Sequence, residues 1–282
     1  MGQSKNGKLQ GKVAAITGGG GVLCGHFART LAMQGVSVAV LDLNLESAQA
    51  VVDSILATGG EAKAYKANVL EKEVMKQVAA TVLADYGPCD ILINGAGGNH
   101  PAGTTSEPFF DAGQVEAPDI KSFFDLEVDG VDFVFKLNFL GTLIPTQAFA
   151  KQMLGREGST VLNISSMNAF TPLTKIPAYS GAKAAISNFT QWLAVHFSKT
   201  GIRVNAMAPG FFLTQQNERL LLNPDGSLTA RGNQIIEQTP LGKFGKPGDL
   251  DSTLLWLCDP SSSFITGVVV PIDGGFSAYS GV

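Results

Sequence analysis

Cysteine is scarce in this chain, whose 282 residues hold three, Cys24, Cys89 and Cys258, far apart in the sequence. An odd, scattered set excludes a disulfide framework and lacks the paired spacing of a zinc site, so we expect no metal and a reducing compartment, the cytoplasm. Basic clusters are also missing at a net charge of −4, which argues against nucleic acid as a partner. No apolar run approaches the ~20 residues that span a bilayer, and the polar N-terminus lacks a signal-peptide core. We therefore expect no membrane partner.

The chain does have 33 glycines and 45% hydrophobic residues, enough for one sizeable core and a single domain over residues 1–282. Strand-like and helix-like segments alternate along it. This order predicts βαβ units, and hence an α/β fold with a Rossmann-like, doubly wound parallel sheet, helices on both faces, and ligands at the carboxyl ends of the strands. The expected strands are 12–17, 36–42, 62–69, 90–94, 160–165, 203–208 and 267–271, and the expected helices are 27–34, 45–58, 71–86, 131–154, 178–199 and 247–258.

Two segments break the alternation. Residues 98–130, which we name the excursion, are rich in Gly, Pro, Thr and acids, and eight acids with one base, Lys121, lie between Glu107 and Asp132. Long segments of this kind are usually functional or disordered, and we interpret this one as ordered surface structure. Residues 210–246 show little strand pattern and two helical patches, at 215–222 and 231–238. We interpret them as a lid over the strand ends.

A glycine-rich turn follows the first expected strand and opens a helix. Glycine lets a backbone approach a pyrophosphate, and a helix N-terminus offers N–H donors to it. Asp42 ends the second strand, where a carboxylate can accept hydrogen bonds from ribose hydroxyls and would repel the 2′-phosphate of NADP. The pattern favours NAD(H) as the cofactor. The alternatives are that the glycine-rich turn is only a flexible loop and that Asp42 is only a loop or helix N-cap residue. The candidate cofactor residues of this turn are Gly18, Gly20, Gly21, Val22 and Leu23.

Tyr179 and Lys183 stand four residues apart, on one face of an expected helix. A free phenol has a pKa near ~10, and a neighbouring ammonium should lower that pKa, so that Tyr179 can exchange a proton while hydride moves at carbon. Ser166, just past a strand, could hold the substrate oxygen. Asn138 lies inside an expected helix. Because Asn has only a modest helix propensity, its presence there suggests a hydrogen-bonding role. Taken singly, each has a structural explanation: a surface pair, a turn serine or a structural asparagine.

With these residues together, the chain resembles the short-chain dehydrogenase/reductase family over nearly its whole length. The resemblance implies a sheet of about seven strands and a homotetramer in which the long helices around Asn138 and Tyr179 pair between subunits. The matching residues are Thr17, Gly18, Asp42, Asn68, Val69, Asn94, Gly95, Ala96, Gly97, Asn138, Ser166, Tyr179, Lys183, Asn205, Pro209, Gly210, Thr214, Asp273, Gly274 and Gly275.

The resemblance also implies roles. Tyr179 would be the general acid/base, Ser166 would orient the carbonyl, Lys183 would bind the nicotinamide ribose and lower the Tyr179 pKa, and Asn138 would hold a relay water. The family's last two fingerprint glycines fall on Val22 and Cys24, so we expect a shifted backbone path there. The implied cofactor contacts are Asn94 and Gly95 beside the ribose, Asn68 and Val69 beside the adenine, Phe212 and Thr214 beside the carboxamide, together with Ala96, Pro209, Gly210, Tyr179 and Lys183.

Residues 97–101, the excursion and residues 133–143 are similar to a subgroup of D-mannonate oxidoreductases (fructuronate reductases). That similarity implies that the hydride acceptor is the keto group of an open-chain sugar acid. Because acids close to the site would repel such an anionic substrate, we expect the acids of the excursion to face water. Another polyol, a keto sugar, a ketoacyl thioester or a ketosteroid is an alternative substrate. Epimerisation, dehydration and non-catalytic sensing of NAD remain alternative activities. The candidate substrate residues are Asn99, His100, Asn168, Lys175 and Gln215, of which His100 and Lys175 have solvent-exposed loop positions as an alternative.

Overall fold

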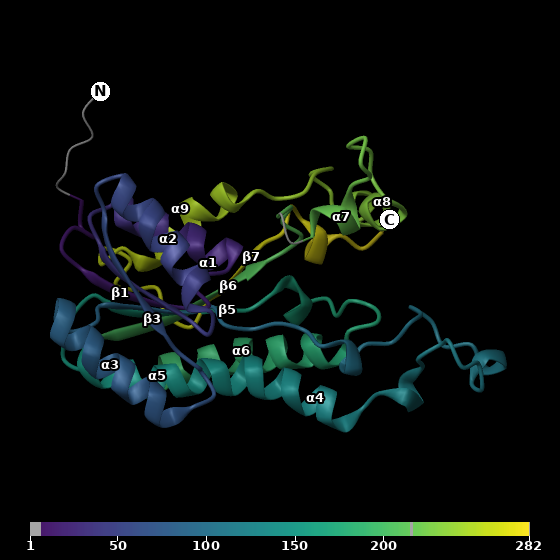
Figure 1. Ribbon diagram of the computed structural model, residues 1–282, viewed down its shortest axis with the longest axis horizontal. Helices are drawn as coiled ribbons and strands as arrows, with labels where there is room; N and C mark the ends of the chain where they lie inside the picture. The colour runs from purple at the N-terminus through teal and green to yellow at the C-terminus, as the bar shows by residue number, and fades with distance from the viewer. Residues whose placement is uncertain (1–6, 215–216, 282) are drawn as a thin grey trace.

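A computed structural model describes residues 7–214 and 217–281 of the chain. At its centre lies one seven-stranded sheet with the order β3-β2-β1-β4-β5-β6-β7, in which every described pairing is parallel (Figure 1). The predicted doubly wound α/β architecture is confirmed. The strands are β1 (Val13–Thr17), β2 (Ser37–Asp42), β3 (Glu61–Lys66), β4 (Ile91–Asn94), β5 (Ser159–Ile164), β6 (Ile202–Pro209) and β7 (Val269–Ile272).

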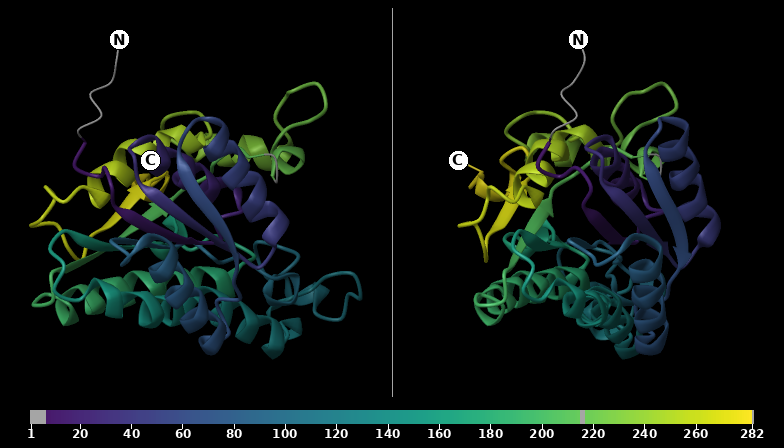
Figure 2. Two further views of the ribbon diagram at one scale, coloured as in Figure 1. Left: turned by 60° about the vertical axis from the view of Figure 1, so that its left-hand side comes forward. Right: turned by 90° about the vertical axis from the view of Figure 1, so that its left-hand side faces the viewer.

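Helices cover both faces of the sheet, as Figures 1 and 2 show. One face packs against α1 (Val22–Met33), α2 (Leu45–Ala57) and α9 (Asp251–Cys258), and the other against α3 (Lys72–Tyr86), α5 (Gly141–Met153) and α6 (Pro177–His196). Because successive side chains of a strand point to opposite faces, Ala14 and Ile16 of β1 join the first core, and Val13 and Ala15 join the second. Within the described ranges, no helix is long and apolar enough to cross a membrane.

The helix expected over 131–154 is one continuous path of three geometries. It consists of α4 (Val128–Phe135), a π-helical segment (Lys136–Leu140) and α5. Two other expectations are corrected at their starts: α1 begins at Val22 rather than residue 27, and a 3₁₀ turn (Pro247–Leu250) precedes α9. The first turn of α1 follows a run of four glycines and contains a fifth, Gly25, so apolar periodicity does not reveal the helix start.

The excursion and residues 210–246 flank the carboxyl ends of the strands (Figure 1). The excursion contains three 3₁₀ turns (Pro101–Gly103, Ala112–Gln114 and Phe123–Asp125) and extends away from the body of the molecule (Figure 1). The segment 210–246 carries α7 (Glu218–Leu221), which lies within the first expected helical patch, and α8 (Ala230–Glu237), which begins one residue before the second. The expectation that the acids face water is confirmed, because all eight are exposed: Glu107, Asp111, Glu116, Asp119, Asp125, Glu127, Asp129 and Asp132.

Candidate active site

The site is built where β1 and β4 lie side by side. The chain leaves β1 toward α1 on one face and leaves β4 toward α4 on the other, which opens a crevice at this point of the sheet. Thr17 ties the two turns together, because its Oγ1 accepts hydrogen bonds from the Gly95 N–H (3.1 Å) and the Ala96 N–H (3.3 Å). Gly18 has φ +64°, and a Cβ there would lie 3.0 Å from the Ala96 backbone. Only glycine fits this close approach of the two turns.

The N-terminus of α1 fits the pyrophosphate of a dinucleotide. Its N-cap is Gly21, no side chain caps it, and its first turn holds no acid. The first amides of a helix lack intrahelical acceptors, and the helix dipole favours an anion there. Since the Gly21 N–H already donates to the Gly18 carbonyl (3.0 Å), the donors of this cradle are the amides of Val22 and Leu23.

Asp42 lies beside this cradle at the end of β2. Its carboxylate accepts hydrogen bonds from the Gly20 N–H (3.0 Å) and the Asn44 N–H (2.9 Å). The carboxylate is therefore held next to the glycine-rich turn, where the ribose hydroxyls of a dinucleotide on α1 can donate to it. A fixed negative charge here disfavours a 2′-phosphate. The residues present thus fit NAD(H).

Cys24 occupies the position of the family's last fingerprint glycine. Its side chain is buried, and a Cβ placed on Gly95 would overlap its sulfur. Burial raises the pKa of the Cys24 thiol to about 12, so the thiol is neutral at physiological pH. The cysteine at this glycine position is accommodated because its sulfur packs against Gly95, and α1 still begins at Val22.

The structure brings Ser166, Tyr179 and Lys183 together at the carboxyl edge. The Lys183 ammonium lies 5.5 Å from the centroid of the Tyr179 ring and donates to the Ile164 carbonyl (2.8 Å). The Ser166 side chain lies within hydrogen-bonding reach of the Tyr179 hydroxyl, and the Ser166 Oγ accepts a hydrogen bond from the Asn168 N–H (3.2 Å). A hydroxyl pair beside a buried cation can hold a carbonyl oxygen and transfer a proton to it.

Burial shifts both titrating groups of this cluster. Desolvation raises the pKa of Tyr179 to about 12, against the lowering effect of the Ser166 hydrogen bond. In the free protein, burial of the phenol therefore has the larger effect, and the lowering of the Tyr179 pKa that we expect from Lys183 stays a prediction. Desolvation also lowers the pKa of Lys183 to about 8, opposed by the charge interaction with Cys24. Tyr179 keeps its proton at neutral pH and suits the role of acid in carbonyl reduction.

Asn138 is fully buried in the π-helical segment. Its Nδ2 donates to the carbonyls of Val134 and Gly98 (both 2.8 Å), and its Oδ1 accepts from the Gly98 N–H (3.3 Å). Thr142 Oγ1 donates to the Asn138 carbonyl (2.9 Å). Asn138 thus fixes the turn after β4 to the helix, and its role with a relay water stays a prediction. Single π-turns of this kind often mark functional sites.

Sequence reasoning left Gly97 and Gly98 out of the candidate site, although they hold it together. A Cβ on Gly97 would lie 2.6 Å from Asn138 Oδ1 and 3.2 Å from Lys183 Nζ. This glycine therefore lets the turn pass between two site residues. The run of glycines after the fourth strand was the available signal, since consecutive glycines mark a close backbone approach.

Three cofactor contacts expected from the resemblance have side chains engaged elsewhere. Asn94 is buried and donates through Nδ2 to Thr146 Oγ1 and Asn163 Oδ1 (both 2.9 Å), so it links β4 to α5 and β5 inside the core. The Phe212 ring belongs to the main core. The Asn68 side chain closes a local turn with Leu70 and Glu71. These residues can offer a cofactor their backbone, and their contacts with it stay a prediction.

The candidate substrate residues differ in their surroundings. Asn99 donates to Thr104 Oγ1 (2.9 Å), and His100 Nδ1 accepts from the Ala102 N–H (3.1 Å), so both shape the start of the excursion. Asn168 is buried next to Ser166. Lys175 is half-buried, with a left-handed backbone at φ 71°. Gln215 lies outside the described residues.

Comparison with known proteins identifies the family. The family described as short chain dehydrogenase matches residues 12–224. The chain belongs to the short-chain dehydrogenase family. A relative from Haemophilus influenzae, named only as an uncharacterized oxidoreductase, is 56% identical over 100% of this chain and 99% of its own. The uncharacterized oxidoreductase UxuB of Bacillus subtilis is 52% identical over 97% of this chain and 98% of its own.

A solved structure resembles this short-chain dehydrogenase closely. It is a Haemophilus influenzae protein provisionally named a D-mannonate oxidoreductase, crystallised with bound NAD. It is 56% identical, covers 99% of both chains and superposes with a TM-score of 0.94. The predictions of an oxidoreductase of this family and of NAD(H) as its cofactor are confirmed.

Proposed function

We propose that this dehydrogenase interconverts an open-chain keto sugar acid, D-fructuronate, and the corresponding hydroxy acid, D-mannonate. We also propose that residues 1–282 form one catalytic domain. The observation that carries the reaction type is the cluster of Ser166, Tyr179 and Lys183 beside the NAD cradle. The choice of substrate is supported by the provisional name of the Haemophilus influenzae relative, with 56% identity over 99% of both chains.

The chain's own residues provide the proton chemistry. Bound NADH supplies a hydride to the carbonyl carbon. Ser166 donates a hydrogen bond to the carbonyl oxygen, and Tyr179 transfers its hydroxyl proton to that oxygen as the alcohol forms. Lys183 binds the nicotinamide ribose and stabilises the phenolate that remains. Alcohol oxidation follows the same steps in reverse, with Tyr179 as the base.

The charged and polar residues near Ser166 support an anionic polyol as substrate. The acids of the excursion are exposed, so the acidic stretch leaves room for a carboxylate at the site. Asn168 and the cation Lys175 lie on the segment between Ser166 and Tyr179, where they offer partners for hydroxyls and a carboxylate. Another polyol, keto sugar or ketoacyl compound is the second candidate, with 210–246 as a lid in either case. A non-catalytic sensor has no need of a serine and a tyrosine held together beside a buried lysine.

We also infer a homotetramer in the cytoplasm. An open apolar groove of about 710 Å³ runs between α3, α5 and α6, and the exposed fraction is 57% for Trp192 and 77% for Val195 on α6. Pairing of these helices between subunits would cover it. Three buried free cysteines support a reducing compartment. Light scattering at the mass of four chains tests the assembly.

A screen of NADH oxidation tests the function, with keto sugar acids, uncharged keto sugars and ketoacyl esters as acceptors. We expect D-fructuronate to have a kcat/KM at least about tenfold above that of any uncharged ketone, because a paired charge is worth more than a neutral hydrogen bond. NADPH serves as the control for the role of Asp42 and should be the poorer cofactor. Turnover with apolar ketones alone would refute the substrate.

A further inference from the structure

Lys175 has an unusual backbone conformation. Among the described residues it is the one non-glycine with positive φ, at 71°. This region costs an L-residue about 1–2 kcal/mol, and Asn or Asp is the usual non-glycine occupant. Strain of this kind persists where the surroundings fix it, and it gathers at ligand-binding sites. Lys175 directly precedes Ile176, the N-cap of α6, the helix that carries Tyr179.

The start of the excursion holds this conformation. The Thr105 N–H donates to the Lys175 carbonyl at 2.8 Å. The 3₁₀ turn Pro101–Gly103 packs against the first turn of α6, since a Cβ on Gly103 would lie 3.3 Å from Ala178 Cβ. Ala102 accepts from the Glu127 N–H at 3.2 Å, which closes the excursion at its base. Thr105 and Lys175 therefore form one junction, beside the turn that presents Tyr179.

The ammonium of Lys175 has no partner among the residues that the structure describes. It forms no hydrogen bond or ion pair with any residue in 7–214 or 217–281. The excursion carries seven acids, but its own cation Lys121 pairs with Glu127 (3.3 Å) and all seven acids are exposed. A half-buried cation that pairs with no carboxylate of the described residues is available to an anionic ligand.

We infer that the excursion, through Thr105, fixes Lys175 as the group that binds the carboxylate of the substrate. The excursion would then be the element that selects acids over uncharged ketoses. The inference rests on the proposed function: the carbonyl of a sugar acid lies at Ser166 and Tyr179, and its carboxylate lies at Lys175, at the start of the same helix. The ion pair adds binding energy for the acid alone.

Lys175→Asn tests the charge, because Asn tolerates the left-handed backbone, and Lys175→Arg keeps the cation. The substrates are D-fructuronate and D-fructose, which differ by a carboxylate in place of a hydroxymethyl group. The discrimination is the ratio of their kcat/KM values with NADH. We expect Lys175→Asn to lower it about 10- to 100-fold, mainly through the KM for the acid, and Lys175→Arg to retain most of it. An equal fall with both substrates would assign Lys175 a structural role and overturn the inference.

Thr105→Pro tests the junction, because proline lacks the N–H that Lys175 accepts. Thr104 already has the extended backbone (φ −126°, ψ 134°) that a following proline requires. Thr105→Ala is the matched control, since it too loses the hydroxyl bond to the Glu107 carbonyl but keeps the N–H. We expect lower discrimination in the proline variant alone, at a similar thermal midpoint.

The outcomes separate the two proposals. If the wild-type enzyme reduces D-fructuronate and neither Lys175→Asn nor Thr105→Pro changes the discrimination, the inference fails and the proposed function stands. If the wild type reduces no sugar acid at all, the proposed function fails and this inference fails with it.

Discussion

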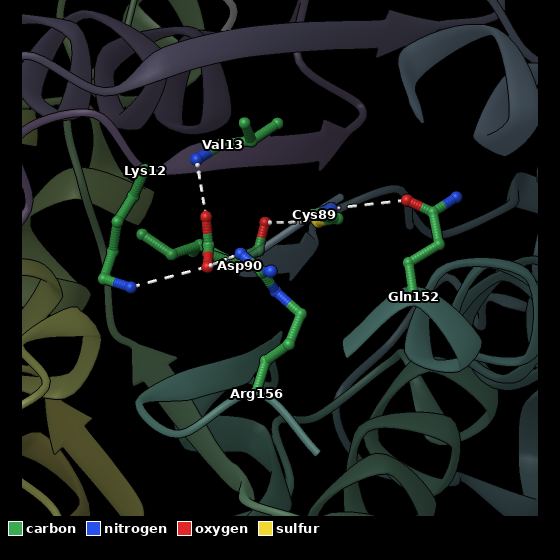
Figure 3. Close-up of polar contacts among 7 residues, drawn as sticks. Lys12, Val13, Cys89, Asp90, Gln152 and Arg156 are labelled. Carbon is green, nitrogen blue, oxygen red and sulfur yellow. Dashed lines mark hydrogen bonds and ion pairs between the residues drawn. The ribbon is translucent and has the colours of Figure 1, made fainter. Parts of the chain in front are cut away.

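Buried ionisable groups have different surroundings at the two ends of the sheet. At the amino end, Asp90 is buried and accepts hydrogen bonds from the Val13 N–H (3.0 Å), Arg156 (2.8 Å) and Lys12 (3.4 Å), as Figure 3 shows. At the carboxyl end, burial lowers the pKa of Lys183 to about 8 and raises that of Tyr179 to about 12. The amino end satisfies its charges and closes the fold. The carboxyl end leaves Lys183 and Tyr179 with shifted pKa values, which is typical of groups that transfer protons.

The Asp90 cluster joins elements that are distant in the sequence. It connects β1, the start of β4 and Arg156 in the segment between α5 and β5. Gln152 of α5 adds a further link, accepting from the Cys89 N–H at 3.3 Å (Figure 3). Changes at this end should therefore alter stability, whereas changes at the other end should alter catalysis.

Tyr179→Phe should have the largest effect. It removes the only atom of that side chain that can donate a proton, and general acid catalysis contributes about 10²- to 10⁴-fold. We expect kcat for sugar-acid reduction to fall at least about 10³-fold. NADH binding, followed by fluorescence titration, should stay within about threefold, because the α1 cradle is untouched. Residual turnover above a tenth of the wild-type rate would contradict the role of Tyr179.

Asp90→Ala should produce the reverse pattern at the amino end. It leaves the Val13 N–H without its acceptor and Arg156 without its carboxylate, and we expect the free energy of unfolding to fall by about 2–3 kcal/mol. Denaturant unfolding measures this loss, while kcat and KM at 25 °C should not change. Lys12→Met is the control: its ion pair is long and partly exposed, so its effect should stay below about 1 kcal/mol. A catalytic defect in folded Asp90→Ala would break the comparison.

Lys183→Met should abolish activity and stabilise the protein. The pKa of Lys183 falls from 10.5 to about 8 on folding, so between these values the unfolded chain binds more protons and wild-type stability rises with pH. Below pH 8 the buried ammonium carries its full cost. Removing it should add about 2 kcal/mol at pH 7, after allowance for the lost hydrogen bond to Ile164. The gain should vanish above pH 10.5, and a pH-independent difference would contradict burial as the cause.

Sequence pattern was sufficient for the sheet and for the central cluster. Apolar runs located the buried central strands of the parallel sheet, and the spacing of Tyr179 and Lys183 located the proton chemistry. The effect of burial on the Tyr179 pKa was missed, because desolvation depends on how α6 is covered in three dimensions. The hydrogen bonds of the Asn94 side chain inside the core were missed for a related reason, because its partners Thr146 and Asn163 are distant in the sequence. The left-handed backbone of Lys175 had no signal, since lysine is not a turn residue.

Cys24→Gly should have the smallest effect, and it asks whether the altered fingerprint matters to the carboxyl end. The change restores the family's glycine but removes the sulfur that packs against Gly95 and adds a flexible residue to the first turn of α1. We expect a loss of about 1 kcal/mol in unfolding free energy. The KM for NADH should change by less than about twofold, because the amides of Val22 and Leu23 supply the cradle in either case. A KM raised tenfold would show that Cys24 sets the backbone path that NAD contacts.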